Sequence, residues 1–221
     1  MWHFLFDLDG TILDTTELIL KSFVYAFREG LGETVSTEEL MVHFGRPLEE
    51  QFRVMRPQLS GSEIDRLVNI YRQHNEMEHD RWVCVVPGAD TGLRNLHDAG
   101  FPLGIVTSKR LNMTIHGLKL FSLDSLFQVI VHMDSTVNHK PHPEPVLHAL
   151  ELMGGVPQKA VYMGDSPYDM MSGHDAEVKT VGFVYNTFTC EVLKHAGADR
   201  VVSTWRDASD ILLQSTRTAN K

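Results

Sequence analysis

Residues 3–14 read HFLFDLDGTILD, and this stretch decides the fold. The apolar run His3–Leu8 ends at Gly10, which predicts a buried β-strand that stops at a glycine turn. Two acidic residues, Asp7 and Asp9, lie where this strand ends. Ligands of an open parallel sheet bind beyond the carboxyl ends of its strands. We therefore expect Asp7 and Asp9 to belong to a functional site.

The next segment, from about residue 15 to 80, is predicted to be helical throughout. Its first apolar stripe has the spacing i, i+3, i+4, i+7 and is formed by Leu20, Phe23, Val24 and Phe27. Apolar positions repeat at helical intervals again within residues 48–55 and 64–71. The block offers the first strand no partner, so we interpret residues 15–83 as an inserted helical domain.

From Pro87 onward, short apolar runs alternate with helical patterns. The predicted strands are Leu103–Val106, Phe127–Val131, Ala160–Met163, Val178–Val184 and Arg200–Val202. The predicted helices are a segment through Leu93 and Leu96, another helix after Val106, and the segments Pro145–Met153, Tyr168–Ala176 and Arg206–Leu213. Such alternation is typical of a parallel sheet covered by helices. The predicted fold class is therefore α/β, with a Rossmann-like core of residues 1–14 and 84–221 and a helical insertion of residues 15–83.

The composition excludes several classes of partner. The 221 residues carry 20 Lys and Arg against 29 Asp and Glu, and no basic run is interleaved with aromatic residues, so we expect no nucleic-acid partner. No apolar run approaches the ~18 residues of a membrane span, and Asp7 and Asp9 interrupt the first apolar segment. We expect a cytoplasmic protein without a membrane segment. With a formal charge of −9, binding of a small anion would require local cations or a metal ion.

Cysteine and histidine have ordinary structural explanations in this chain. Cys84 and Cys190 lie in apolar surroundings without a metal-ligand pattern, so we expect two buried, reduced thiols. His139 and His142 have the spacing of a metal-binding pair, but with 12 histidines in the chain such pairs arise by chance. We favour chance for this pair and leave its role open.

Polar residues follow four of the predicted strands. They are Asp7 and Asp9, Thr107 and Ser108, Lys140, and Asp165 and Asp169. Carboxylates that converge on one place repel one another, so we expect a hard cation such as Mg²⁺ to neutralise them. We expect Lys140 to bind an anion. Taken alone, Thr107 and Ser108 could be ordinary helix caps and Lys140 an ordinary surface residue. Asp169 alone could be an acid that stabilises the first turn of its helix. Because all of these residues follow predicted strands, we favour the interpretation that they form one functional site.

These segments closely resemble the four motifs of the haloacid dehalogenase superfamily of phosphohydrolases, and they occur in the superfamily's order. FDLDGT at residues 6–11 is similar to the first motif and VTS at 106–108 to the second. Lys140-Pro141 is similar to the third, and GDSPYD at 164–169 to the fourth. The similarity covers essentially the whole chain. The helical insertion after the first motif resembles the first cap class of the superfamily.

The resemblance implies a nucleophile, an acid–base group and a metal site. Asp7 would attack phosphorus to give an aspartyl-phosphate, and Asp9 would serve as general acid and then as general base. Carboxylate oxygens of Asp7 and Asp165, with the backbone carbonyl of Asp9, would bind Mg²⁺. Asp169 would orient a bound water or Lys140.

The resemblance also implies a phosphoryl-binding group and a cap that selects substrates. Thr107, Ser108 and Lys140 would hold the phosphoryl oxygens and stabilise charge in the transition state, with Thr107 and Lys140 counted as catalytic. The cap loop HFGRPL at residues 43–48 contains Gly45 and Arg46 and is the segment best suited to reach the site. Arg46 would either clamp a second anion or be a solvated arginine of an interhelical turn. A charge-reversal variant distinguishes these alternatives.

At a finer level the chain is similar to the small bacterial pyrophosphatases of this superfamily. The similar segments are residues 71–75, 103–107, 117–120 and 138–146. His142 departs from the pattern because an aspartate is expected there. Phosphoglycolate phosphatases share nearly all these features. We therefore rank inorganic pyrophosphate first as the small phosphorylated substrate and phosphoglycolate or another small phosphomonoester second, hydrolysed by a monomer or homodimer.

Three other classes of protein stay open as alternatives. A sugar-phosphate mutase of the β-phosphoglucomutase kind keeps every core motif but retains the phosphoryl group, so accumulation of inorganic phosphate would exclude it. A dehalogenase also uses an aspartate nucleophile but needs no Mg²⁺ and typically lacks an acid at the position of Asp9. A non-catalytic binding module would be expected to have lost Asp7 or Lys140, and both are present.

Overall fold

The computed structural model describes residues 1–217, with side chains up to residue 214. The chain divides into two compact units. The first consists of Met1–Asp14 together with the chain from Cys84 onward, and the second is Thr15–Val83. None of the described helices is long and apolar enough to cross a membrane.

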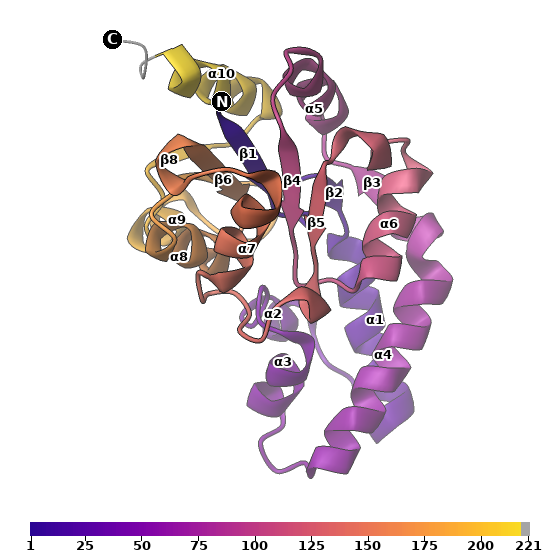
Figure 1. Cartoon of the computed structure of the whole chain (residues 1–221). Helices are drawn as coiled ribbons and strands as arrows, with labels where there is room; N and C mark the ends of the chain where they lie inside the picture. Colours follow the sequence, from indigo (N-terminus) through magenta and orange to yellow (C-terminus); the bar gives the residue numbers. More distant parts are fainter. Residues whose placement is uncertain (218–221) are drawn as a thin grey trace. The chain divides into compact units, whose positions relative to one another are not determined.

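The first unit is built on a six-stranded parallel sheet with the strand order β5-β4-β1-β6-β7-β8 (Figure 1). Its strands are β1 (His3–Phe6), β4 (Leu103–Val106), β5 (Val129–Val131), β6 (Ala160–Gly164), β7 (Lys179–Phe183) and β8 (Arg200–Val202). The predicted parallel sheet is confirmed, and the predicted strands at Leu103–Val106 and Arg200–Val202 have the observed bounds. Strand β1 is shorter than the apolar run suggests, because Asp7 and Leu8 already belong to the following turn.

Helices cover both faces of this sheet. They are α5 (Ala89–Asp98), α6 (Leu111–Leu120), α7 (Glu144–Met153), α8 (Pro167–Asp175), α9 (Cys190–His195) and α10 (Trp205–Arg217), with short 3₁₀ turns at Asp124–Leu126, Met133–Ser135 and Pro157–Lys159. Leu5 of β1 packs in one apolar cluster with Val146 and Leu150 of α7. The next residue, Phe6, stacks on Trp205 of α10 with ring centroids 5.6 Å apart. Because successive strand residues point to opposite faces, α7 and α10 lie on opposite sides of the sheet.

Every regular element described in the second unit is a helix, in agreement with the sequence. The helices are α1 (Thr16–Leu31), α2 (Thr37–Met41), α3 (Leu48–Met55) and α4 (Gly61–Trp82). Ser60 and Glu63 form a reciprocal capping box at the start of α4, and Gly32 ends α1 in the left-handed conformation at φ 70°. Phe23, Phe52 and other buried apolar residues give this unit a hydrophobic cluster of its own.

Two features of the junction between residues 14 and 84 differ from expectation. A two-residue strand β2 (Leu13–Asp14) pairs antiparallel with β3 (Cys84–Val85), and the sequence pattern did not predict this short sheet. The prediction of two buried thiols is wrong, because Cys84 is exposed and Cys190 is only half-buried. Cys84 lies on a short strand outside the main sheet, where one face of the chain meets solvent.

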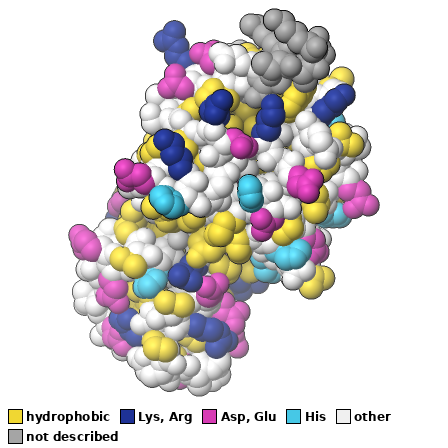
Figure 2. Space-filling view, turned by 90° about the vertical axis from the view of Figure 1, so that its left-hand side faces the viewer, with side chains coloured by type: hydrophobic (Ala, Val, Ile, Leu, Met, Phe, Trp, Pro, Cys, Tyr) yellow, Lys and Arg dark blue, Asp and Glu magenta, His cyan; other side chains and the backbone are white. Residues whose placement is uncertain are grey.

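Charged side chains are spread over the face of the molecule shown in Figure 2. On that face Lys and Arg are interspersed with Asp and Glu rather than gathered in a basic patch. A nucleic-acid groove would require such a patch. The face in view shows no such patch.

Helix α10 also supports the loop that follows β1. The indole Nε1 of Trp205 donates a hydrogen bond of 2.8 Å to the backbone carbonyl of Thr11, and both residues are buried. A buried carbonyl that loses its donor costs more free energy than the net value of the hydrogen bond itself. Trp205 therefore fixes the backbone next to the predicted acidic site.

We predict that Trp205→Phe lowers the free energy of unfolding by about 1–3 kcal/mol, because the carbonyl of Thr11 is left without its donor. Urea titration followed by far-ultraviolet circular dichroism measures this loss. Trp82→Phe is the matched control, since its indole donates to Glu78 at a partly exposed position where water can replace it. Equal losses in the two variants would contradict this account of Trp205.

Candidate active site

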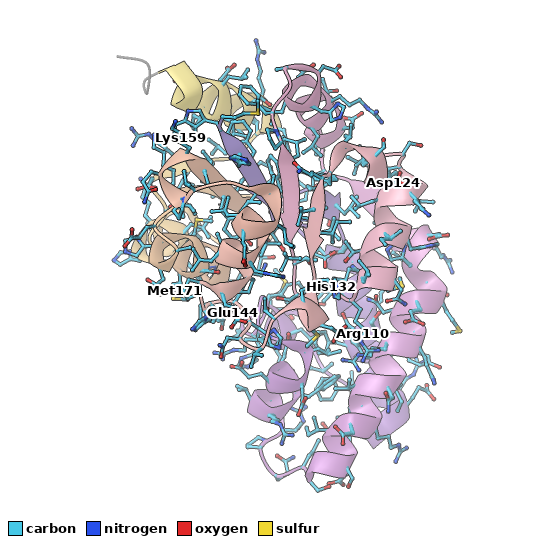
Figure 3. The ribbon with its side chains drawn as sticks, in the orientation of Figure 1. Arg110, Asp124, His132, Glu144, Lys159 and Met171 are labelled. Atoms are coloured by element: carbon cyan, nitrogen blue, oxygen red, sulfur yellow. The ribbon has the colours of Figure 1, made fainter. Side chains whose placement is uncertain are left out.

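The predicted site residues of the first unit lie at the carboxyl end of the sheet. In Figure 3 the labelled Arg110 and His132, which follow β4 and β5 in the chain, lie at one end of the strands. Lys159 and Asp124, which precede β6 and β5, lie at the opposite end. Since all six strands are parallel, the loops after β1, β4, β5 and β6 meet at one edge.

Lys140 is the centre of this arrangement. Its Nζ donates hydrogen bonds of 2.8 Å to Asp7 Oδ1 and 2.6 Å to Asp169 Oδ1, and its side chain is 7% exposed. Burial alone would lower the pKa of Lys140, but attraction to Asp169 and Asp7 outweighs burial and raises that pKa. Lys140 is therefore a fixed positive charge that joins two strand ends.

Asp169 is fully occupied by hydrogen-bond donors. Its Oδ1 accepts from Lys140 and lies 2.7 Å from the hydroxyl of Tyr162, and its Oδ2 accepts from the backbone N–H and the hydroxyl of Ser166 at 3.0 and 2.6 Å. Ser166 and Asp169 also form the capping box of α8. Both oxygens of Asp169 are thus used within the protein, and the carboxylate holds Lys140 in place.

Asp165 packs against the turn that follows β1. Gly10 has a φ of 81°, and a Cβ added there would lie 2.3 Å from Asp165 Oδ2. Glycine is required at this position both for the positive φ and for the close approach of the carboxylate. The sequence signal of an Asp-Gly turn after the first strand therefore has a direct structural reason.

The acidic group carries more negative charge than the protein balances. Oxygens of Asp7, Asp165 and Asp169 lie within 4.8 Å of one another, and Lys140 is the cation that binds two of them. Burial, followed by repulsion from Asp7 and Asp169, raises the pKa of Asp165 well above its usual range. Burial raises the pKa of Asp7 to about 7, with repulsion from Asp169 adding to it and attraction to Lys140 opposing it. Uncompensated carboxylate oxygens are the donor set that a hard divalent cation prefers.

The two hydroxyl residues after β4 are placed differently. Thr107 is buried, its backbone N–H donates to the carbonyl of Val131 at 2.9 Å, and its Oγ1 accepts from the backbone N–H of Lys109 at 3.1 Å. Ser108 is exposed. Thr107 is therefore held rigidly at the strand end, and the binding of a phosphoryl oxygen by either hydroxyl stays a prediction.

Asp9 has a partner that the sequence analysis missed. Lys109 Nζ lies 2.8 Å from Asp9 Oδ1, although these residues are 100 positions apart. Tyr162, which contacts Asp169 and Lys140 from within β6, was missed as well. The available signals were a lysine two positions after Thr107 and a tyrosine hydroxyl inside an otherwise apolar strand.

Gly45 and Arg46 belong to the second unit. Gly45 has a φ of 82°, so it allows the turn before α3. Arg46 Nη1 lies 2.6 Å from Glu50 Oε1, and the two side chains are 33% and 47% exposed. An exposed pair with this i,i+4 spacing contributes only about 0.3–0.5 kcal/mol. Contact of Arg46 with a substrate stays a prediction.

The raised pKa of Asp7 predicts how metal-free stability depends on pH. The folded protein keeps the Asp7 proton up to a pH of about 7, whereas the unfolded chain releases it near the ordinary pKa of 3.8. The free energy of unfolding contributed by Asp7 therefore falls as the pH rises between these values, and the loss is complete above about pH 7. Asp7→Asn should gain stability relative to the wild type across this window.

This difference is measured by urea titration of both proteins in a chelator between about pH 5 and pH 8. Histidines titrate in the same range, but they are common to both proteins and cancel in the difference. A constant stability difference between the wild type and Asp7→Asn would contradict the raised pKa.

Comparison with known proteins agrees with this geometry. Residues 4–183 match the family model of the haloacid dehalogenase-like hydrolases. The chain is 40% identical to pyrophosphatase PpaX of Bacillus pumilus over 182 residues, which is 82% of each protein. It is 34% identical to pyrophosphatase PpaX of Halalkalibacterium halodurans over 208 residues, covering 94% of this chain and 95% of the relative.

Solved structures share the fold at lower identity. A Haemophilus somnus chain described as "a predicted phosphoglycolate phosphatase" has a TM-score of 0.87 at 22% identity and covers 96% of this chain and 97% of its own. A hydrolase from Pseudomonas syringae has a TM-score of 0.86 at 23% identity, with 97% and 99% covered. The motifs, the parallel sheet and these matches establish that the chain belongs to the haloacid dehalogenase-like hydrolase family.

Proposed function

We propose that the protein is a Mg²⁺-dependent phosphohydrolase that acts through an aspartyl-phosphate on a small phosphate compound. The observation that carries this proposal is the carboxylate of Asp7 at the end of β1, bound to the buried Lys140 and adjacent to Asp165. A nucleophile, a fixed cation and a metal-binding acid within one cluster are the parts that phosphoryl transfer requires.

Carboxylate oxygens of Asp7 and Asp165, with the backbone carbonyl of Asp9, would hold the Mg²⁺ ion. Asp169 is a poor ligand because both of its oxygens accept hydrogen bonds from protein groups. When bound, Mg²⁺ neutralises negative charge on phosphoryl oxygens and so lowers the barrier to attack by an anion.

In the first step a carboxylate oxygen of Asp7 forms a bond to phosphorus while the bond from phosphorus to the leaving oxygen breaks. Asp9 gives its proton to that leaving oxygen. The ammonium group of Lys140 and the hydroxyl groups of Thr107 and Ser108 would stabilise the charge on the remaining phosphoryl oxygens. The products of this step are the protonated leaving group and the aspartyl-phosphate.

In the second step the oxygen of a water molecule forms a bond to phosphorus and the bond to Asp7 breaks. Asp9, now a carboxylate, takes a proton from that water. Inorganic phosphate is released, the carboxylate of Asp7 is restored, and Asp9 is protonated again by the proton taken from the water. Lys140 stays protonated throughout, because Asp7 and Asp169 hold its charge.

Inorganic pyrophosphate is the first candidate substrate, and phosphoglycolate or another small phosphomonoester is the second. Relatives at 34% and 40% identity are named pyrophosphatases, whereas the phosphoglycolate phosphatase description comes from a chain with 22% identity. We further propose that residues 15–83 act as the cap and that Arg46, in the turn after Gly45, contacts the leaving group. The working form would be a cytoplasmic monomer or homodimer.

We predict that the wild type releases inorganic phosphate fastest from pyrophosphate within a panel of pyrophosphate, phosphoglycolate and sugar phosphates. Asp7→Asn should fold but lose activity by at least about a thousandfold, because the nucleophile is gone. Phosphate release is measured with Mg²⁺ and after chelation of Mg²⁺. Chelation should abolish the activity of the wild type. Activity retained by Asp7→Asn would refute the aspartyl-phosphate mechanism, and preference for a sugar phosphate would overturn the substrate ranking.

Removal of one acid should abolish stabilisation by the metal. Saturating Mg²⁺ should raise the melting temperature of the wild type by about 5 °C or more, because the ion binds only the folded state. Asp165→Asn should show little rise, while Asp175→Asn, an exposed residue at the end of α8, should respond like the wild type. Differential scanning fluorimetry measures these shifts. An undiminished shift in Asp165→Asn would place the metal elsewhere.

A further inference from the structure

Lys109 binds the second aspartate of the site from the end of the neighbouring strand. Its Nζ lies 2.8 Å from Asp9 Oδ1, and the side chains of Lys109 and Asp9 are 11% and 25% exposed. Lysine side chains usually lie in solvent. Holding a long side chain in one conformation costs rotamer entropy, so a lysine buried to this degree needs a compensating partner.

Both the backbone N–H and the backbone carbonyl of Lys109 form hydrogen bonds. Its N–H donates to Thr107 Oγ1 at 3.1 Å, and its carbonyl accepts from the N–H of Met133 at 3.1 Å. Thr107 directly follows β4, and Met133 follows β5. The lysine is therefore anchored to two strand ends while its side chain reaches the end of a third strand, β1. This placement distinguishes it from a surface lysine that pairs by chance.

The charges around the Lys109–Asp9 pair indicate what the pair does. Lys140 binds Asp7 and Asp169, so it is not the partner of Asp9. Asp9 lies two residues after Asp7, and two neighbouring carboxylates repel each other. Lys109 supplies a second cation, and attraction between partly buried charges is less screened than attraction between charges in solvent. The ion pair therefore restrains the Asp9 carboxyl group in a defined orientation.

We infer that Lys109 is a positioning residue that orients the carboxyl group of Asp9 for its acid–base role. The inference rests on the proposed function. Lys109 engages Oδ1, so the exchange of the proton is assigned to Oδ2. In the first step Oδ2 donates its proton to the leaving oxygen as the phosphorus–oxygen bond breaks, and in the second step Oδ2 accepts a proton from the attacking water. Lys109 donates its hydrogen bond to Oδ1 in both steps.

A misplaced acid should matter more for poor leaving groups than for good ones. The nitrophenolate ion departs from p-nitrophenyl phosphate with little need for a proton, whereas the less acidic phenol of phenyl phosphate needs one. The two esters have closely similar shapes. The ratio of their kcat/KM values therefore reports on proton donation, because kcat/KM covers the steps up to phosphoryl transfer to Asp7.

The test uses Lys109→Met in the full chain with Mg²⁺. We expect kcat/KM for phenyl phosphate to fall by about tenfold or more and kcat/KM for p-nitrophenyl phosphate to fall by less than about threefold. Lys109→Arg should restore phenyl phosphate hydrolysis to within about threefold of the wild type, because it keeps the charge and the donor. Lys119→Met, which removes an exposed lysine on α6, should leave both values unchanged.

A double-mutant cycle provides an independent test. If Lys109 acts through Asp9, adding Lys109→Met to Asp9→Asn should change kcat/KM by less than about twofold. Additive losses, an equal loss with both esters, or a rise in KM alone would overturn the inference. Lys109→Gln gives the same comparison if Lys109→Met does not fold. The proposed function fails separately, if the wild type releases no phosphate from pyrophosphate or from either ester, or if Asp7→Asn remains active.

Discussion

The rest of the site depends on the ion pairs that the buried ammonium group of Lys140 forms with two aspartates. A lysine taken out of water is costly unless anionic partners surround it. Here the partners come from Asp7 after β1 and Asp169 in the first turn of α8, at 2.8 and 2.6 Å. Asp169 is itself fixed by Ser166 and by the hydroxyl of Tyr162. The ion pairs therefore link Asp7, the proposed nucleophile, to groups that are themselves held by hydrogen bonds.

The same cluster contains more carboxyl groups than cationic groups. One lysine between Asp7 and Asp169 leaves Asp165 to face other carboxylates, and the pKa values of Asp7 and Asp165 rise as a result of burial and repulsion. A protein selected only for stability would replace such groups with apolar ones. The imbalance is understandable if a divalent cation completes the site and a phosphoryl anion then meets both the cation and Lys140.

The sequence was sufficient to predict the parallel sheet, the all-helical character of residues 15–83 and the gathering of Asp7, Lys140 and Asp165. These follow from local signals, because apolar runs define strands and parallel strands bring their ends together. Partners that depend on side-chain reach were not predictable in this way. Lys109 and Tyr162 each become site neighbours only when another strand is placed beside them. The exposure of Cys84 was missed for the same reason, since its short strand lies outside the main sheet.

Lys140 and Lys109 are fixed more strongly than Arg46, and under the proposed function this difference has a consequence for specificity. In the first unit Lys140 and Lys109 are held by carboxylates in buried or partly buried positions. In the second unit Arg46 forms an exposed ion pair with Glu50, one helical turn away. A pair of that kind is worth about 0.3–0.5 kcal/mol, so an incoming anion can displace Glu50 at little cost. Under the proposed function, the steps common to every substrate would thus depend on firmly held charges, whereas the selection of the leaving group would depend on a charge that is easily released.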